Sequence, residues 1–460
     1  MEKYLRLYAE PEVAALDGLP DQAPWENVMV IPACNETSGL LRPPPPCGGR
    51  SLMILVINES VSASHSVSLN NQALAATVQA QFDLQWQSTP ELSGPESTEF
   101  RLSLLKDPLS ARDVLLVDRF NEGRKLPAKG GVGHARKIGA DLALSLIHHK
   151  RVRSPWIHCT DADVRLPETY FACSNAVQNT GSTYAALVYP FHHCDDQDKA
   201  ESREVLLATQ LYELSLRYYV AGMKFARSPY AFHTIGSTMA VSAVHYAKVR
   251  GFPKRAAGED FYLLNKLAKV GAVLELGSSS NCEPIEIEAR RSDRVPFGTG
   301  AAVNKITGLA DLVMDFRFYD PAVFELLQLW LQSLPEIWQS RSNDLAASMF
   351  TGLSDDHGQR DKRAVLLAGL KEIKTEQALD HAFRQSKNLD QFTRQMHTWF
   401  DAFRTLKLIH YLRDSHMPTI GFAMLEVDQI YRHLLTRDPD LLAFHEQLIQ
   451  YIRPDNLGAK

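Results

Sequence analysis

The chain has 460 residues, of which 45% are hydrophobic and 22% charged, and its formal net charge is -5. This balance predicts a globular protein of two or three domains and excludes a fibrous or disordered chain. The slight negative charge argues against nucleic acid as a partner, because it supplies no general attraction for phosphate backbones.

Targeting segments and cysteines set the expected compartment. No apolar run is long enough to predict a membrane-spanning helix, and the first residues lack the apolar core of a signal peptide. The six cysteines are sparse and irregularly spaced, so we expect reduced thiols rather than a disulfide framework. These features predict a cytoplasmic protein, and they leave peripheral membrane contact and homo-oligomer formation open.

Apolar runs and helical patterns alternate through the first 300 residues. Runs of Val, Ile and Leu between turn residues predict buried strands at 28–31, 52–57, 114–117, 156–160, 184–190, 238–241 and 272–276. Helical spacing predicts helices at 69–82, 132–149, 199–225 and 261–270. This alternation predicts an α/β fold that binds its ligands at the carboxyl ends of the strands.

The pattern changes near residue 301, after which only helices are predicted. We therefore expect two domains, an α/β catalytic domain over 1–300 and an α-helical domain over 301–460. No motif in the helical part indicates a chemistry.

Two aspartates follow the strand at 156–160, in the sequence WIHCTDADVRLP. Asp161 and Asp163 repel each other unless a cation or a shared proton compensates their charge. Oxygen ligands of this kind suit Mg²⁺ or Mn²⁺ better than zinc. The triplet alone also arises by chance, so its interpretation as a metal site depends on its neighbours.

The sequence GGVGHARKIGAD, over 130–141, joins a glycine-rich turn to a helix. Backbone N–H groups at a helix start, together with Arg136 and Lys137, form a candidate phosphate site. The alternative is an ordinary loop with solvated basic residues, and the pattern lacks the Gly-Lys-Ser/Thr ending of a P-loop.

Glu259 and Asp260 follow a glycine and precede an apolar helix. They are candidates for a general base, or simply for acidic residues that stabilise the start of a helix. The helix dipole favours their charged form, so we expect Asp260 to be ionised at neutral pH.

Several other residue types fit either a site or a structural role. His158 lies within an apolar strand, which favours a hydrogen-bonded core histidine, whereas His233 is a candidate third metal contact. Arg290, Arg291 and Arg294 are either a solvated charged run or cations that close over a diphosphate.

Taken in order, the segments VMVIPACNE, LVINES, GGVGHARKIGAD, HCTDADVRLP and GSTMAVSAVHYAKVRGFPKRAAGEDFYLLNKLAKVG resemble the GT-A glycosyltransferases, most closely the inverting enzymes of family 2. The resemblance covers about 27–277. It implies a GT-A fold, a mixed sheet flanked by helices, followed here by the helical C-terminal region. It also implies transfer of a hexose-type sugar from a UDP- or GDP-sugar donor to an acceptor hydroxyl, with inversion. The acceptor is not indicated.

The resemblance also implies residue roles for the donor. Pro32, Ala33 and Glu36 match the first-strand motif that holds the base and ribose. Asn58 stands where the family commonly has a base-reading aspartate, which leaves the base open. Arg136 matches the arginine of the family's A-R-N-x-G helix, with Lys137 in place of the asparagine, and both would lie near the nucleotide.

The remaining implied roles concern the reaction. Asp161 and Asp163 match the D-x-D motif whose metal bridges the diphosphate, with Asp161 also near the donor. Asp260, with Glu259 beside it, matches the base that deprotonates the acceptor. The polymer-synthase signature Gln-x-x-Arg-Trp is not evident, so a processive synthase is not expected.

Two alternatives belong to other classes. Asp161-Ala162-Asp163-Val164 also fits the nucleophile motif of haloacid-dehalogenase phosphohydrolases, in which the first aspartate is phosphorylated. Three predicted strands and a basic helix precede the motif, which is awkward for that fold. The third interpretation is a catalytically silent scaffold with the helical region as its interaction surface.

Overall fold

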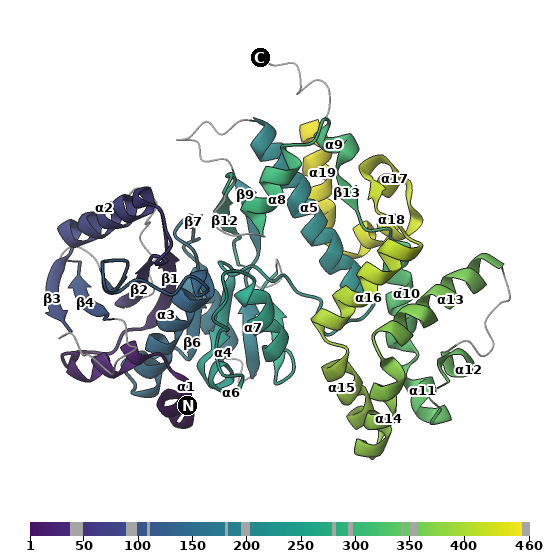
Figure 1. Ribbon diagram of the computed structural model, residues 1–460, viewed down its shortest axis with the longest axis horizontal. Helices are drawn as coiled ribbons and strands as arrows, with labels where there is room; N and C mark the ends of the chain where they lie inside the picture. The colour runs from purple at the N-terminus through teal and green to yellow at the C-terminus, as the bar shows by residue number, and fades with distance from the viewer. Residues whose placement is uncertain are drawn as a thin grey trace. The chain divides into compact units, whose positions relative to one another are not determined.

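The structure is a computed structural model. It describes residues 1–36, 49–88, 99–107, 111–179, 183–194, 203–277, 282–292, 298–342, 344–349 and 357–452. The chain forms two compact units, of which the first comprises Met1–Glu201 with Thr234–Ala301 and the second Ser202–His233 with Ala302–Lys460. The protein is thus an α/β chain with a helical C-terminal region, labelled in Figure 1.

The first unit is built on a mixed sheet. Among the described residues it contains nine strands in the order β11-β8-β10-β6-β1-β2-β5-β4-β3. Their bounds are β1 Asn27–Ala33, β2 Ser51–Asn58, β3 Asp83–Gln87, β4 Arg101–Lys106, β5 Arg112–Arg119, β6 Trp156–Cys159, β8 Tyr184–Val188, β10 Met239–Ser242 and β11 Ala272–Glu275. The strands β6, β1, β2 and β5 are parallel neighbours, and β10 is antiparallel to both β6 and β8.

Parallel pairing explains why these central strands read as continuous apolar runs. Every residue of β1 and β2 is buried, as expected for a strand covered by structure on both faces. The helices of this unit are α1 Glu2–Tyr8, the 3₁₀ helix η1 Pro11–Gly18, α2 His65–Gln81, α3 Gly131–His148, α4 Tyr170–Asn179, α6 Ala243–Lys248 and α7 Glu259–Leu267. Helix α3 packs on β1, β2 and β6, and α2 packs on β2 and β3.

A smaller sheet in the same unit borders the carboxyl end of β6. It contains β7 Val164–Arg165, β12 Ile285–Glu288 and β9 Phe191–Cys194, with β12 in the middle. Strand β12 is antiparallel to β7 and parallel to β9. It therefore brings the segment after residue 282 next to the two aspartates that follow β6.

The second unit is mainly helical. Its helices are α5 Arg203–Phe225, α9 Leu312–Asp315, α10 Ala322–Gln332, α11 Leu334–Ser340, α12 Leu345–Met349, α13 His357–Glu372, α14 Thr375–Gln385, α15 Leu389–Trp399, α16 Ala402–Ser415, α17 Phe422–Val427, α18 Gln429–Arg437 and α19 Pro439–Ile452, and α8 Thr299–Ile306 spans the boundary between the units. Strands β13 Arg317–Phe318 and β14 Ile420–Gly421 form a small antiparallel pair. Helix α5 packs against α10, α18 and α19.

The core of this unit is aromatic. Trp330, Phe324 and Tyr431 are fully or almost fully buried. A cavity of about 320 Å³ lies between α14, α15 and the start of α16, with Trp399 and Arg404 in its lining. In the part of the chain that the structure describes, no helix has the length and apolar character needed to cross a membrane.

All seven strands predicted from apolar runs are present, as are the four helices, with ends shifted by a few residues. Strands β3, β4, β7, β9 and β12 were not predicted, nor were β13 and β14, which lie in the part where only helices were expected. Helix α5 lies within the predicted α/β part of the sequence, between β9 and β10, but it clusters with the second unit.

Candidate functional site

Neighbouring parallel strands bring several predicted site residues to one edge of the sheet. Pro32 and Ala33 are the last residues of β1, and Glu36 follows in the turn. Asn58 ends β2, and Asp161 follows the end of β6. Because β6, β1 and β2 are adjacent and parallel, their carboxyl ends meet at this edge.

Arg136 lies at the centre of a buried ion cluster. Its Nη2 donates to Asp161 Oδ1 at 2.6 Å and its Nε to Glu259 Oε1 at 2.7 Å, while Nη1 donates to the Gly236 carbonyl at 2.7 Å. The side chains of Arg136 and Glu259 are each 4% exposed, but that of Asp161 is 35% exposed. Burial opposes the charge of Arg136, yet the two carboxylates raise its pKa above the ordinary value. The cluster thus joins the motifs at 136, 161 and 259 and is open to solvent at Asp161.

The glycines before Arg136 have a packing role. The Gly133 N–H donates to the Arg255 carbonyl at 3.0 Å. A Cβ at Gly133 would lie 2.6 Å from that oxygen and 2.7 Å from the Pro253 carbonyl. Backbone of the segment before α7 therefore occupies the position at which the sequence predicted a phosphate. The glycines instead let this segment approach α3 closely.

Gly258 directs the start of α7. It has φ of 72° in the left-handed region, which glycine adopts without steric cost. Glu259 then turns to Arg136, and Asp260 Oδ1 accepts from the Phe261 N–H at 2.7 Å. Glu259 is thus an ion-pair partner at the site and more than a helix cap.

Partial burial changes the titration of Asp161 and of Asp260, which follows Glu259. It raises the pKa of Asp161 to about 6, with Arg136 lowering it and Asp163 and Glu259 raising it further. Burial, followed by the charge of Glu259, raises the pKa of Asp260 to about 7. The expectation that the helix dipole keeps Asp260 fully ionised at neutral pH was therefore wrong, because burial and the adjacent carboxylate oppose it.

Arg290 forms a second ion cluster beside the first. Its guanidinium donates to Glu36 Oε1 at 3.0 Å and Oε2 at 3.2 Å, and also to Asp163 Oδ2. The side chain of Arg290 is 19% exposed and that of Glu36 only 4%. Strand β12 lies beside β7 and ends at Glu288, two residues before Arg290. This strand therefore positions the arginine. Arg294 lies outside the described residues.

Lys137 faces a different environment from Arg136. Its Nζ donates to Asp141 Oδ2 at 2.6 Å, Tyr4 Oη at 2.9 Å and the Tyr8 carbonyl at 2.9 Å. Glu10 joins this network, and although burial opposes it, His134 and Lys254 lower the pKa of Glu10 to about 2. These contacts attach the N-terminal segment to α3 and give Lys137 a structural role.

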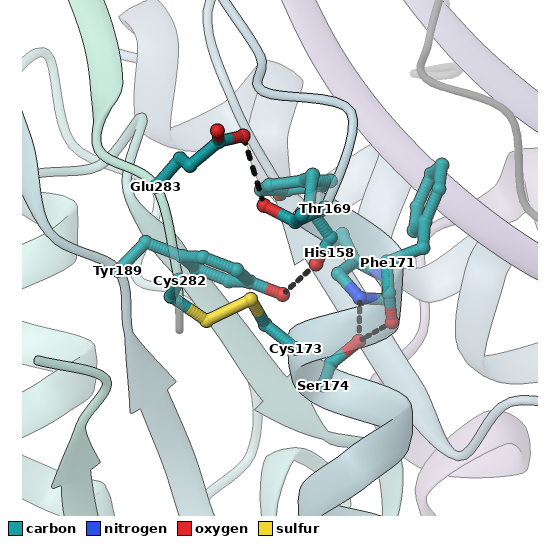
Figure 2. Close-up of a disulfide and its surroundings, with 9 residues drawn as sticks. His158, Thr169, Phe171, Cys173, Ser174, Tyr189, Cys282 and Glu283 are labelled. Atoms are coloured by element: carbon teal, nitrogen blue, oxygen red, sulfur yellow. Dashed lines mark hydrogen bonds between the residues drawn. A yellow bond between two sulfur atoms is a disulfide. The ribbon is translucent and has the colours of Figure 1, made fainter. Parts of the chain in front are cut away.

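The two histidines behave differently. His158 contacts the Val28 carbonyl through Nδ1 at 3.0 Å and Ser174 Oγ through Nε2 at 2.9 Å, and burial lowers its pKa to about 4. Figure 2 shows its contact with Ser174. The prediction of a core histidine is confirmed. His233 belongs to the second unit, where burial, Arg217 and Lys224 lower its pKa to about 3.

The carboxylates fit a hard divalent cation that keeps other ligands. Among the described residues, no three His, Cys, Asp or Glu side chains are grouped to hold a metal. Asp161 and Asp163 nevertheless lie close enough for the charge of one to raise the pKa of the other. Mg²⁺ typically binds one or two carboxylates and completes its coordination with water and substrate phosphates. Asp161 and Asp163 therefore supply the number and type of protein ligands that Mg²⁺ or Mn²⁺ takes when water and a substrate phosphate complete its coordination.

A disulfide near the site was not predicted. Cys173 on α4 is bonded to Cys282, which precedes β12, across a sequence separation of 109 residues (Figure 2). The expectation of reduced thiols was wrong for this pair, because the fold brings together cysteines that are far apart in sequence. Cys34, Cys159 and Cys194 form no disulfide with one another, and Cys47 lies outside the described residues.

No family model and no curated protein matches the chain. Among solved structures, the mannosyltransferase PcManGT from Pyrobaculum calidifontis, in complex with GDP-Man and Mn²⁺, aligns with 90% of this chain and 96% of its own. The TM-score is 0.31 and the identity 14%, which does not establish a shared fold.

Proposed function

We propose that the protein is a glycosyltransferase that moves a sugar from a nucleotide-diphosphate donor to an acceptor hydroxyl. The observation that carries this proposal is the pair of ion clusters at the carboxyl edge of the sheet. One joins Arg136 to Asp161 and Glu259, and the other joins Arg290 to Asp163 and Glu36. Cations and carboxylates gathered at a strand edge suit an anionic ligand that brings its own metal ion.

The donor's leaving group explains the need for positive charge. When the bond between sugar and diphosphate breaks, negative charge develops on the departing oxygen. A preorganised guanidinium stabilises that charge through hydrogen bonds that are stronger than those between neutral groups. Arg136 is held by three acceptors and is therefore preorganised, while the more exposed Arg290 can exchange partners.

Asp161 and Asp163 would hold a divalent cation. When bound, Mg²⁺ or Mn²⁺ would neutralise part of the diphosphate charge. Arg136 and Arg290 bind these same two aspartates in the structure. We infer that Arg290 leaves Asp163 when the cation binds and is then available to the donor.

Asp260 is the proposed general base. A pKa of about 7 suits this role, because a base works best when its pKa lies near the operating pH. Asp260 takes the proton of the acceptor hydroxyl as that oxygen bonds to the anomeric carbon, and the bond from this carbon to the diphosphate breaks. A single displacement of this kind inverts the anomeric configuration. Glu259 positions Arg136 beside it.

The end of β1 and of β2 would receive the nucleoside. Pro32 and Ala33 offer backbone at this edge, and Glu36 and Asn58 offer polar side chains for the ribose and base. The side chain of Asn58 can both donate and accept hydrogen bonds, so it suits the base of a UDP-sugar as well as that of a GDP-sugar. Assays with both kinds of donor select between them.

Donor cleavage tests the proposal against its alternatives. The protein is incubated with UDP-, GDP- and dTDP-sugars and Mn²⁺, and release of nucleoside diphosphate is measured, with phosphate release from p-nitrophenyl phosphate as the parallel assay. Cleavage of a nucleotide sugar that Asp163→Ala abolishes supports the transferase. Phosphate release that depends on Asp161 would show instead that the protein is a phosphohydrolase. Absence of both reactions, together with absence of nucleotide binding, would favour a scaffold.

A further inference from the structure

The cavity of about 320 Å³ in the second unit has a preformed wall. Helices α14 and α15 (Figure 1) pack against each other through Phe383 and Phe392, whose rings stack with their centroids 5.2 Å apart. Leu379 on α14 and Met396 on α15 are also buried. Because these side chains fix the two helices, the cavity between them does not have to be assembled by a ligand. Its volume lies at the lower end of the range for ligand pockets, about 300 to 1,000 Å³, which suits a small molecule.

The lining of this cavity is positively charged. It contains Lys374 and Arg404, with His381 as a further nitrogen ligand, and none of the described residues that line it is acidic. Asp401 Oδ1 lies 4.0 Å from Arg404 Nη1, but this carboxylate is the cap of α16 and accepts from the Arg404 backbone N–H. A long ion pair in a partly exposed position compensates little of the guanidinium charge. The cavity therefore favours an anion.

Arg404 is held in a fixed orientation at the cavity. Its Nη1 donates to the Trp399 carbonyl at 2.7 Å, and its guanidinium carbon lies over the Trp399 ring, 4.9 Å from the ring centre. Among the described residues, its Nε and Nη2 have no hydrogen-bond partner. These two nitrogens form one edge of the guanidinium, the fork that binds two oxygens of a phosphate. With the side chain 38% exposed, this edge is open to a ligand.

The remaining polar lining suits a sugar ring. Gln377 and Gln395 carry amides that both donate and accept hydrogen bonds, as sugar hydroxyls do. The indole of Trp399 offers apolar surface for the C–H face of a ring, and one N–H donor. An anion with hydroxyl groups and a flat apolar face therefore matches this lining better than a bare inorganic anion.

We propose that the cavity between α14, α15 and α16 binds a sugar monophosphate. The phosphate lies at Arg404 and Lys374, and the sugar lies beside Trp399 and the two glutamines. All the residues that line the cavity belong to the second unit, so the site is separate from the carboxylates at the edge of the sheet. It gives the helical region a ligand of its own, and it does not depend on the proposed glycosyltransferase function.

Isothermal titration calorimetry on the full chain tests the site. The probes are glucose 6-phosphate, mannose 6-phosphate and glucose 1-phosphate, compared with glucose and inorganic phosphate in the same buffer without divalent metal. The tightest sugar phosphate is expected to bind at least about 10-fold more tightly than glucose or inorganic phosphate, because each of these makes only part of the contacts. Failure of all three sugar phosphates to bind overturns the proposal. So does glucose or inorganic phosphate that binds as tightly as the tightest of them.

Substitutions assign the binding to this cavity. Arg404→Met removes the guanidinium fork and should weaken binding of the tightest sugar phosphate at least about 10-fold, the scale of one lost charge-assisted contact. Lys407→Met removes an exposed cation of the same helix outside the cavity and should leave the affinity unchanged. If Arg404→Met does not fold, Lys374→Met replaces it, since Lys374 is exposed, with an expected loss of about 3-fold. Wild-type affinity in the folded variant overturns the proposal.

Hydrogen exchange followed by mass spectrometry locates the bound sugar phosphate independently. Amides of 373–382 and 395–404 are expected to exchange more slowly when the tightest sugar phosphate is bound, because the ligand opposes local opening of the segments that it contacts. Protection confined to 159–163 and 130–141 would place the ligand at the carboxylate site instead. That result would overturn the proposed cavity site and leave the glycosyltransferase proposal intact.

Discussion

Asp260 has a pKa of about 7 because it is half-buried beside Glu259, which makes its charge costly at neutral pH. If it is the base, activity should rise as the pH increases through about 7 and then level off.

Asp260→Asn keeps the size of the side chain but not its basicity, so transfer should fall by about 10² to 10⁴-fold with little change in donor affinity. Steady-state rates from pH 5 to 9 measure both effects.

The matched control is Asp83→Asn, on the exposed strand β3, which should leave the rate unchanged. A variant Asp260→Asn with the parent rate would remove Asp260 from the mechanism. Loss of activity in Glu259→Gln would not by itself identify Glu259 as the base, because Glu259 also holds Arg136.

The same pKa predicts how stability depends on pH. The folded protein binds the Asp260 proton more tightly than the unfolded chain, whose aspartates titrate near 4, so this group makes stability fall as the pH rises from about 4 to about 7. Removing the charge should therefore stabilise the protein at pH 8. We expect Asp260→Asn to raise the free energy of unfolding there by about 1 kcal/mol, after allowing for partial exposure, and to have little effect at pH 4. Urea unfolding at the two pH values provides the test, and a variant less stable than the wild type at pH 8 would contradict it.

Arg136 is bound by two carboxylates and a carbonyl, so its replacement affects folding as well as binding. Arg136→Met leaves Glu259 buried without its partner and should lower the free energy of unfolding by about 3 to 5 kcal/mol. Arg136→Lys keeps the charge but not the fork-shaped geometry, so it should retain more stability and still bind nucleotide more weakly. Denaturant unfolding and nucleotide titration of both variants separate the effects. An Arg136→Met protein as stable as the wild type would mean that the cluster does not form.

At the scale of elements, helix α3 serves two functions with adjacent residues. Arg136 faces the site, whereas Lys137 binds Asp141 and the N-terminal segment. Lys137→Met should therefore lower the free energy of unfolding by about 3 kcal/mol, because it leaves buried carboxylates uncompensated. Nucleotide affinity of the folded protein should not change. Lys129→Met, at an exposed position before the same helix, is the control. A large loss of nucleotide affinity in Lys137→Met without loss of stability would mean that Lys137 contacts the nucleotide.

The elements differ in how far their sequence predicts them. Strands β1, β2 and β5 are buried on both faces, and their continuous apolar runs identified them. Strand β12, of sequence IEIE, lies in a charged segment, and its alternation is the only local signal of a half-buried strand. Strand β4, RLSLLK, was not predicted, although four of its residues are buried. Both strands depend on partners that are distant in sequence.

At the scale of the whole molecule, the sequence placed Glu36, Asn58 and Asp161 correctly at one sheet edge, because parallel strands align their carboxyl ends. It could not show which charges would pair across that edge. The bonds from Arg136 to Glu259 and from Arg290 to Glu36 join residues 123 and 254 positions apart. Nor could it pair Cys173 with Cys282, since six cysteines allow many connectivities. Their pairing is a product of the tertiary fold.

Nucleotide binding by the full chain tests the central claim most directly, because it requires no knowledge of the acceptor. UDP, GDP and dTDP, each free and attached to a sugar, are titrated calorimetrically with Mn²⁺ and then with the metal removed by a chelator. We predict that one nucleotide series binds, that binding weakens at least about 10-fold without the metal, and that Asp163→Ala loses this metal dependence. Binding of no nucleotide by the folded protein, or binding that is equal with and without the metal and unchanged in Asp163→Ala, would contradict the account.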